Sequence, residues 1–283
     1  MTKYWILLVP LFYFSCARGQ NDPDKEEWIQ LFNRKDLTGW DVKIKGFPLN
    51  ENYANTFRVE DGLLKAAYDQ YNKFDGHFGH LFYKDKFSYY RLRVSYRFTG
   101  HQVPGGPGWA VRNNGLMLHS QPAASMGLNQ DFPLSIEVQL LGGIGKGPRP
   151  TGNVCTPGTN IVMDGKLVTK HCISSSSKTY NGDQWVEIEV VVLGDSLITH
   201  IVEGDTVLSY SKPQTGGGKL AGYEWTDFED GTPVKDGYIT IQGESAPTDF
   251  RKIELLNLEG CTDPKAKNYK SYYMKSDNSK CKY

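Results

Sequence analysis

The clearest feature of the chain is a two-residue alternation of apolar and polar side chains. In the segment 89–98, YYRLRVSYRF, aromatic and aliphatic residues alternate with arginine and serine, as in a β-strand with one buried face. Similar runs between turn residues occupy 57–66, 115–121, 134–142, 185–210, 237–244 and 250–258. No long segment has a 3.6-residue period, so the pattern predicts an all-β protein.

Turn residues punctuate these runs at regular intervals. Gly194-Asp195 and Gly204-Asp205 are typical of hairpin turns in an antiparallel meander. Long loops rich in glycine and proline are expected at 100–108, 142–160 and 211–236. The arrangement predicts an antiparallel jelly-roll β-sandwich. Segment 142–180 is interpreted as an ordered excursion over one sheet, with its own hairpin at Asp164-Gly165.

Three of the predicted strands carry polar residues on one face and apolar residues on the other. Strand parity places on this face Asn113, His119 and Gln121 with Gly115 and Met117 on one strand, Glu137 and Gln139 on the second, and Gln242 and Glu244 on the third. In a jelly roll the three faces would converge on the concave sheet and form a binding site. The alternative is an ordinary solvated outer face, on which Glu, Gln and His are common.

Composition narrows the class of ligand. The chain has 283 residues, 39% of them hydrophobic, and its 32 basic residues balance its 32 acidic ones. That balance argues against nucleic acid or a polybasic membrane surface as the main partner. The 17 Tyr, 13 Phe and 6 Trp residues suit uncharged polar ligands such as sugars, whose C–H faces stack on aromatic rings, although aromatic residues also fill β-cores.

The N-terminus has the layout of a secretory signal. One lysine precedes an apolar run from Tyr4 to Phe14 that is too short for an ordinary membrane span. Residues 1–16 are interpreted as a signal peptide with a lipobox-like Cys16, which would be lipidated, and 17–27 as a polar tether. The alternative is a plainly cleaved signal. We expect an exported bacterial protein, periplasmic or anchored to the outer membrane, that meets the membrane only through its lipid.

Four cysteines remain after Cys16, an even number that favours two disulfides in an exported protein. The simplest pairing joins Cys155 to Cys172 and Cys261 to Cys281. A zinc site using His171 beside Cys172 is the alternative, although no CxxC spacing supports it. After Leu258 the composition shifts to Lys, Tyr, Ser and Asn, so 28–258 is predicted to be the sandwich domain and 259–283 a disulfide-closed C-terminal tail.

An ordered set of motifs resembles the 3-keto-disaccharide hydrolase family, long known only as a domain of unknown function. The motifs include LFNRKDLTGW (31–40), FRVEDGLL (57–64), NNGLMLHSQ (113–121), IEVQLLG (136–142), DQWVEIEV (183–190) and GYITIQGESAPTDFRKIELLNL (237–258). The resemblance implies a concanavalin A-like, glucanase-like jelly roll. It also implies cleavage of 3-keto-glycosides by elimination to a 3-keto-2-hydroxy-glucal, which is then hydrated. His119 stands where many members carry an arginine.

Such chemistry needs a base at C2, a donor at the C3 oxygen and an acid for the leaving group, and no pair of ordinary glycosidase carboxylates. On this resemblance we expect His119 and Glu137 to be catalytic, because an imidazole titrates near neutral pH and Glu137 could orient it or act as the base. The predicted substrate-binding residues are Asn113, Gln121, Gln139, Gln242, Glu244, Trp109, Arg112, His80 and His171.

Several alternatives stay open at this point. No spacing motif demands a cofactor, but His119, Glu137 and Glu244 could hold a divalent metal that polarises the ketone. The partners expected are an oxidised glycoside and an oxidoreductase that makes it. The sequence does not decide between lyase and hydratase steps. The main rival is a noncatalytic, lectin-like carbohydrate-binding module on the same fold, and the third is a structural surface protein displayed through its tail.

Overall fold

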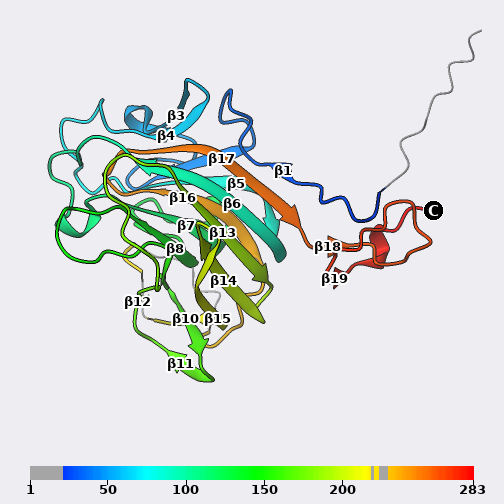
Figure 1. Cartoon of the computed structure of the whole chain (residues 1–283). Coiled ribbons are helices and arrows are strands. Elements are labelled where there is room, and N and C mark those ends of the chain that lie inside the picture. The colour runs from blue at the N-terminus through cyan, green and yellow to red at the C-terminus, as the bar shows by residue number, and fades with distance from the viewer. Residues whose placement is uncertain (1–21, 218–219, 223–228) are drawn as a thin grey trace, which may run out of the picture.

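Two antiparallel β-sheets lie face to face and enclose the main hydrophobic core (Figure 1). The structure is a computed structural model that describes residues 22–217, 220–222 and 229–283. The predicted all-β jelly-roll sandwich is confirmed. The helical elements among these residues are single 3₁₀ turns: η1 (Tyr53–Asn55), η2 (Gly108–Ala110), η3 (Ala123–Ser125) and η4 (Asn278–Lys280). Within the described ranges no helix reaches the length and apolarity of a membrane span.

The larger sheet has ten strands. Their order is β11-β10-β15-β14-β13-β6-β17-β4-β3, and β1 pairs with β17 beside this path. The strand bounds are β1 (Ile29–Gln30), β3 (Phe57–Glu60), β4 (Leu63–Ala66), β6 (Tyr89–Phe98), β10 (Thr159–Met163), β11 (Lys166–Val168), β13 (Val186–Leu193), β14 (Leu197–Val202), β15 (Asp205–Thr215) and β17 (Thr248–Asn257). The β13-β14 and β14-β15 hairpins turn at the predicted Gly-Asp pairs.

The smaller sheet has seven strands in the order β12-β9-β8-β7-β16-β5-β2. Their bounds are β2 (Trp40–Ile44), β5 (Gly79–Phe87), β7 (Asn113–Ser120), β8 (Ile136–Leu141), β9 (Asn153–Cys155), β12 (Cys172–Ile173) and β16 (Gly237–Gly243). The apolar face of each strand turns inward. Leu116 of β7 and Val138 of β8 are fully buried in the same core as Leu92 and Val94 of β6, as period-two alternation requires.

Segment 142–180 is ordered, and it contributes strands to both sheets rather than only lying over one. Its β9 and β12 extend the smaller sheet, and β10 pairs with β15 of the larger one. The predicted hairpin at Asp164-Gly165 is the turn between β10 and β11, where Met163 pairs with Lys166. The segment is therefore an edge extension of the sandwich.

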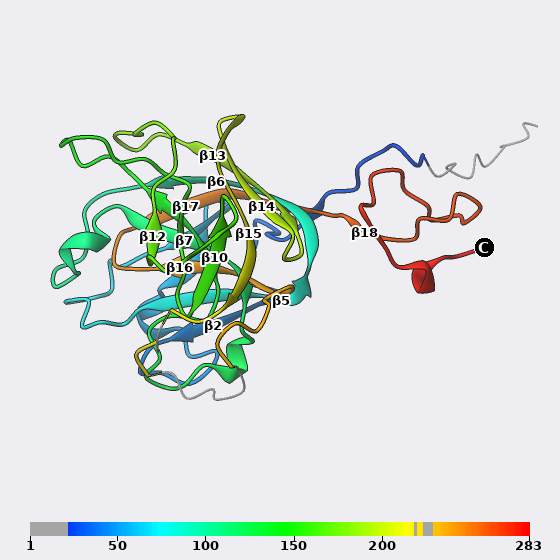
Figure 2. The same ribbon diagram turned by 90° about the horizontal axis from the view of Figure 1, so that it is seen from below.

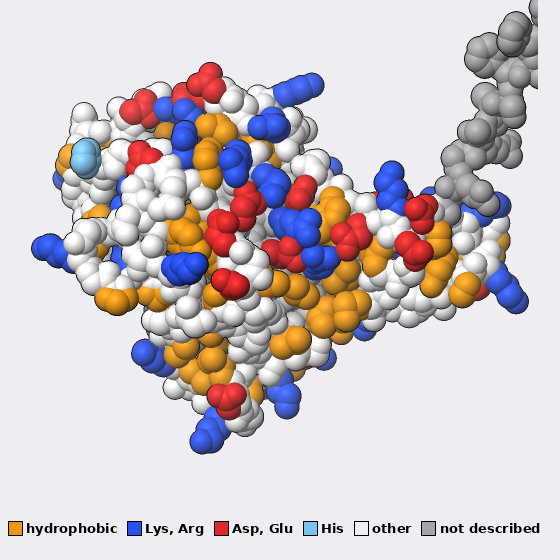
Figure 3. All heavy atoms as spheres, in the orientation of Figure 1, with side chains coloured by type: hydrophobic (Ala, Val, Ile, Leu, Met, Phe, Trp, Pro, Cys, Tyr) orange, Lys and Arg blue, Asp and Glu red, His pale blue; other side chains and the backbone are white. Residues whose placement is uncertain are grey.

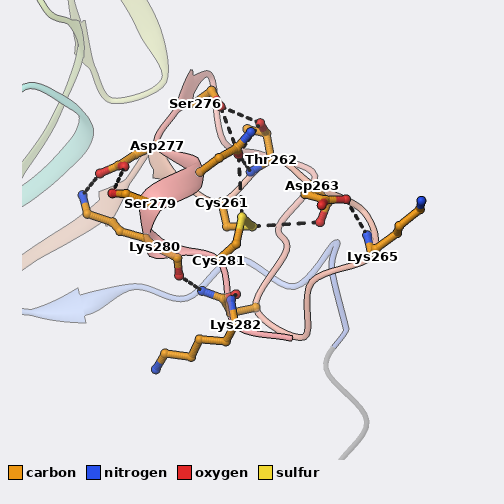
Figure 4. The surroundings of a disulfide bond; sticks show 12 residues. Cys261, Thr262, Asp263, Lys265, Ser276, Asp277, Ser279, Lys280, Cys281 and Lys282 are labelled. Carbon is orange, nitrogen blue, oxygen red and sulfur yellow. Dashed lines mark hydrogen bonds and ion pairs between the residues drawn. A yellow bond between two sulfur atoms is a disulfide. The ribbon is translucent and has the colours of Figure 1, made fainter.

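The C-terminal tail forms a separate small unit beside the sandwich (Figures 1 and 2). Its strands β18 (Glu259–Gly260) and β19 (Lys275–Ser276) pair in parallel, and the predicted Cys261–Cys281 disulfide closes it. Around this bond short polar contacts such as Asp277 to Lys280 and Asp263 to the Lys265 amide fix the loops (Figure 4).

The tail also holds the segment that precedes the sandwich. Lys270 is 4% exposed and donates to Glu27 at 2.6 Å and to the Asp22 carbonyl at 3.1 Å. Ser271 donates to Asp24 at 2.6 Å. Residues 22–27, expected to be part of a tether, thus lie fixed against the tail. The predicted signal peptide and Cys16 lie outside the described residues.

Acidic and basic side chains are interspersed on the face shown in Figure 3, and neither sign forms a large continuous patch there. The outward residues of β6 and β13 illustrate the pattern. Arg91 and Arg93 both donate to Glu189, at 2.8 and 2.6 Å. Such mixed charge gives the face no strong field for a polyanion.

Candidate functional site

A cavity of about 450 Å³ opens on the outer face of the smaller sheet. Its floor comes from β7 and β8, because the parity that buries Leu116 and Val138 between the sheets turns Asn113, Glu137 and Gln139 outward. The cavity is lined by Trp109, Asn113, Asp131, Phe132, Glu137, Gln139, Cys155, Pro157, His171, Cys172, Leu220, Ala221 and Glu244. Six of the predicted site residues therefore meet in one cavity: Trp109, Asn113, Glu137, Gln139, His171 and Glu244.

Two buried carboxyl groups, Glu137 and Glu244, face this cavity. They are 6% and 2% exposed. Burial raises the pKa of Glu137 to about 8. Burial raises the pKa of Glu244 well above its usual range, and the charge of Glu137 raises it further. Because two neighbouring carboxylates resist ionising together, each of these carboxyl groups holds its proton more readily than an ordinary glutamate does.

Gly115 lets side chains from β8 and β16 approach each other across β7. A Cβ atom on Gly115 would lie 2.7 Å from Oε1 of both Glu137 and Gln242, closer than real Cβ contacts allow. A glycine inside a strand often marks such a close approach. The missing side chain therefore lets the Glu137 carboxyl and the Gln242 amide approach each other beside Gly115. Glu137 lines the cavity, whereas Gln242 is fully buried and is not among the lining residues.

His80 and Gln242 are unusual because they are fully buried and polar. Both lie on the same sheet face and pair in register between β5 and β16. Within the described residues, both ring nitrogens of His80, both amide atoms of Gln242 and Oε2 of Glu244 have no hydrogen-bond partner. Burial, together with the nearby Lys43 ammonium, lowers the pKa of His80 to about 3, so its imidazole is neutral. Buried polar groups without partners call for an explanation. Glu244 lines the cavity, whereas the predicted binding residues His80 and Gln242 are not among the lining residues.

Other polar residues of the floor are held by the protein. Asn153 of β9 donates to Oε1 of Gln139 at 2.9 Å, which fixes the Gln139 amide. Oδ1 of Asn113 is buried and has no partner among the described residues. The floor thus has one amide that the protein holds in place, Gln139. Asn113 and Glu244 each keep one oxygen that could accept or share a hydrogen bond with a ligand.

One wall of the cavity is aromatic. Trp109 of η2 is 54% exposed and lies parallel to Phe78, with ring centroids 5.9 Å apart and an interplanar angle of 9°. Phe78 contacts Phe132 at 4.9 Å, and Phe132 contacts His80 at 5.8 Å. The rings therefore run from the buried His80 to the exposed Trp109.

The remaining lining includes the Cys155–Cys172 disulfide, which confirms the predicted pairing. This bond joins β9 to β12, and Cys155 pairs in register with Glu137. The exposed His171 precedes Cys172, and its carbonyl accepts the Thr156 amide at 2.9 Å. The disulfide thereby holds His171 at the cavity rim.

His119 does not share the face of Glu137, so the predicted pairing of the two is wrong. Its φ of 50° lies in the left-handed region, and the register between β7 and β16 shifts there. This bulge reverses the strand parity. The imidazole lies against the Tyr90 ring of the core and its Nε2 contacts the Gly194 carbonyl at 3.1 Å, on the other side of the sheet.

Two predicted binding residues also lie away from the cavity. Arg112 bonds to the Gly182 carbonyl and lies 5.6 Å from the centre of the Phe98 ring, so it fixes loop 181–183. Gln121 accepts from Gln130 at 2.9 Å and from the Leu134 amide at 2.8 Å. Its role in the fold is to hold the loop between β7 and β8.

Neither predicted metal set is present. The His119, Glu137 and Glu244 set does not converge, because His119 lies across the sheet. Among the described residues one cluster of metal-ligand types occurs, Cys155, His171 and Cys172, but its two sulfurs are bonded to each other. Disulfide sulfurs are not thiolate ligands, so only the imidazole of that cluster could bind a metal.

The family model of the 3-keto-alpha-glucoside-1,2-lyase-like domain matches residues 27–256. The chain belongs to this family. The matched range covers the strands of both sheets except the last residue of β17 and ends before the tail. This carbohydrate-active domain contains the whole cavity. No curated protein matches the chain by sequence.

Solved structures with related folds are distant. Two proteins from Parabacteroides distasonis, each proposed to be a glycosyl hydrolase, are 16% and 17% identical, both with TM-scores of 0.47. The alignments cover 82% of this chain in both cases, and 100% and 94% of those chains. A carbohydrate-binding module, CBM66 of Bacillus subtilis, is 9% identical with a TM-score of 0.38, covering 78% of this chain and 96% of its own.

Some residues of this family member's cavity were not predicted from sequence. Phe132, Asp131 and Pro157 line it from loops, where no periodicity marks a face. Asn153 shares strand parity with Cys155 in β9, but three residues are too short a run to show alternation. One signal in the sequence could have indicated the close approach of Glu137 and Gln242. It is Gly115, a glycine inside a predicted strand.

Proposed function

We propose that this member of the family cleaves 3-keto-glycosides, with Glu137 as the base and Glu244 as the acid. The observation that carries the proposal is the pair of buried carboxyl groups that line one cavity, where burial raises the pKa of both. Two carboxyl groups whose environment raises their pKa values toward neutrality can serve as a base and an acid. A site that only binds sugar has no need of such a pair.

The chemistry follows from the ketone at C3. It acidifies the proton on C2, because the resulting carbanion is delocalised as an enolate. The Glu137 carboxylate removes that proton, and the amide of Gln242 donates a hydrogen bond to the C3 oxygen, where negative charge develops. The C1–O bond then breaks, and protonated Glu244 gives its proton to the departing oxygen. The products are the free aglycone and a 3-keto-2-hydroxy-glucal.

Hydration reverses these roles. The Glu244 carboxylate takes a proton from the water that adds to C1, and protonated Glu137 returns a proton to C2. The sum of the two steps is the hydrolysis of one glycosidic bond, and both carboxyl groups finish in their initial states. The substrate must be supplied by an oxidation of the C3 hydroxyl, so a partner oxidoreductase belongs to the proposal.

Export is also part of the proposal. The disulfides Cys155–Cys172 and Cys261–Cys281 suit an oxidising compartment, and the apolar run 4–14 before Cys16 has the composition of a lipoprotein signal. We therefore place the protein outside the bacterial cytoplasm, periplasmic or held at the outer membrane by a lipid on Cys16. Mass spectrometry of the mature N-terminus tests this directly.

The function is tested with methyl 3-keto-α-glucoside in D₂O. Wild type should release methanol and incorporate deuterium at C2, and Glu137→Gln should lower both rates by roughly 10²- to 10⁴-fold, the usual contribution of a general base. Glu244→Gln should slow methanol release more than exchange at C2. Glu189→Gln on the outer face, where Arg91 and Arg93 hold the carboxylate, is the matched control and should retain full activity.

The lectin-like alternative makes a different prediction in the same experiment. A carbohydrate-binding module would bind the sugar, leave it unchanged and incorporate no deuterium. That result in the wild-type protein would overturn the enzymatic proposal. Full turnover by Glu137→Gln would instead leave the activity in place and refute the assignment of the base.

A further inference from the structure

The cavity has two chemically different ends. The carboxyl groups of Glu137 and Glu244 and the buried amides lie on the floor, whereas Trp109 and Phe132 form a wall that reaches the surface. A sugar ring with a ketone and several hydroxyls suits the polar floor. The aromatic wall presents flat ring faces, which suit an aromatic ring or the C–H face of a sugar. It reaches the surface, whereas the two carboxyl groups are buried, so a different part of the ligand would contact it.

Trp109 is exposed and yet rigidly held. Its indole is supported on the inner side by the parallel ring of Phe78, while 54% of the residue stays accessible. Exposed large aromatic side chains supported in this way are typical of binding surfaces rather than of a core. The indole face that does not contact Phe78 is available to a ligand.

The loop that carries Trp109 is fastened to the residue that follows Glu244. The side chain of Gln102 donates to Oγ of Ser245 at 2.8 Å and to the Pro107 carbonyl at 2.9 Å. The amide of Val103 donates to the Ser245 carbonyl at 3.1 Å. The position of the indole is therefore fixed relative to the Glu244 carboxyl group before any ligand binds, which lowers the ordering cost of binding.

Gly106 packs closely against the side chains of Gln102 and Ser245, which form this hydrogen bond. A Cβ atom there would lie 2.5 Å from Nε2 of Gln102 and 2.6 Å from Oγ of Ser245. Ser245 itself has a φ of 85°, in the left-handed region that a serine seldom adopts. Backbone strain of this kind is retained where the surrounding structure enforces it. Here it occurs where the loop that carries Trp109 is hydrogen-bonded to the residue after Glu244.

We propose that Trp109 binds the aglycone, and that the preferred substrates are 3-keto-glucosides whose aglycone presents a flat apolar ring. This inference rests on the proposed function, since it assigns the leaving half of the same substrate. Glu244 lies at the bond that breaks, so the leaving group must extend from it along the aromatic wall. Pro157 is a further apolar residue of the lining.

The test compares phenyl and methyl 3-keto-α-glucosides in wild type, Trp109→Ala and Trp109→Phe. Dividing each variant's kcat/KM by the wild-type value for the same substrate cancels the different reactivity of phenoxide and methoxide. Ring stacking supports a loss of about tenfold or more for the phenyl substrate in Trp109→Ala. The methyl substrate should lose less than about twofold, because its aglycone does not reach the indole. Trp109→Phe should recover much of the loss.

Trp185→Ala is the matched control, because Trp185 is a half-buried tryptophan that contacts Arg97 and Arg251 away from the cavity. It should change neither substrate's kcat/KM. Equal losses for both substrates in Trp109→Ala would show that the indole acts on the sugar or on the fold, and would overturn the inference. Unchanged values for both would overturn it as well.

A binding measurement separates this inference from the proposed function. Calorimetry with phenyl and methyl α-glucosides, which carry no ketone and are not eliminated, should show tighter binding of the phenyl compound to wild type and equal binding to Trp109→Ala. Equal binding of both compounds to wild type would refute the aglycone site even if turnover is observed. A phenyl preference that depends on Trp109, in a protein without turnover, would support the site and refute the chemistry.

Discussion

At the scale of single residues, the two glutamates of the cavity differ from those of the outer face in their partners. Glu189 is also partly buried, and burial alone would raise its pKa, but hydrogen bonds from Arg91 and Arg93 lower it. Neither Glu137 nor Glu244 forms an ion pair among the described residues that would offset burial in this way. The same side chain is therefore an anion on one sheet and a proton carrier on the other.

This difference predicts how stability depends on pH. In the unfolded chain a glutamate ionises near pH 4.5, whereas in the folded protein the pKa of Glu137 is about 8. Between these values the folded state binds more protons, so the free energy of unfolding falls as pH rises. Glu137→Gln removes this dependence. Its Tm should match wild type near pH 4.5 and exceed it by on the order of 5 °C at pH 8.

Thermal unfolding of both proteins from pH 4.5 to 8 measures this gap. Glu189→Gln gives the opposite sign as a control, because its folded pKa is lowered. Its ionised form stabilises the fold above the unfolded pKa, and that contribution is lost as pH falls through the folded pKa. The Gln variant should therefore be less stable than wild type at neutral pH. Parallel Tm curves for Glu137→Gln and wild type would contradict the buried pair.

At the scale of elements, β7 decides which side chains can meet at the site. Its third residue, Gly115, lies between the side chains of Glu137 and Gln242. Its far end bulges at His119, which sends the imidazole to the core side. The conformation of β7 thus leaves room for Glu137 at the site and turns His119 away from it.

Gly115→Ala tests the first of these effects. Its added methyl group would force Glu137 and Gln242 apart, so we expect kcat to fall by at least about tenfold, as misplacement of a catalytic group commonly causes. The cost in stability should be about 1–3 kcal/mol, as for other overpacked sites. Gly108→Ala is the control, because a Cβ atom there meets nothing within 4 Å, and it should leave Tm unchanged. Wild-type kcat in Gly115→Ala would show that the two side chains do not act together.

At the scale of the whole molecule, the sandwich and the tail are joined at few points. The β18 and β19 strands pair with each other. The buried Lys270 of the tail donates hydrogen bonds to Asp22 and Glu27 of the segment 22–27. The lining of the cavity, as far as the chain is described, includes no residue after Glu244. The tail therefore contributes to the position of the N-terminal segment more than to the site.

A chain truncated after Leu258 should accordingly keep its activity. We expect kcat/KM for the phenyl substrate within about twofold of wild type, and a Tm lowered by a few degrees because the Lys275–Tyr89 contact and the bonds to residues 22–27 are lost. Limited proteolysis should then cut the segment 22–27 faster. A large loss of turnover at unchanged Tm would show that the tail takes part in catalysis.

The sequence alone determined the fold class, the face on which several polar residues of the site lie, and the number of disulfides. Alternating side chains predicted the strands and the sandwich, because a buried face imposes a two-residue period. The same parity placed Glu137, Gln139, Asn113 and Glu244 on one side, and the even cysteine count predicted both disulfides. Each of these inferences depends on local geometry or on simple chemistry, which the order of residues specifies.

The tertiary structure decided the rest. Parity fails at a bulge, so nothing local to NNGLMLHSQ shows that His119 faces the core while Asn113 faces the cavity. Phe78, Phe132 and Trp109 come from different loops, and their contacts depend on how those loops cross the sheet. The raised pKa of Glu137 arises from desolvation by neighbours distant in sequence. Burial and close approach belong to the packed molecule, because they depend on every neighbour at once.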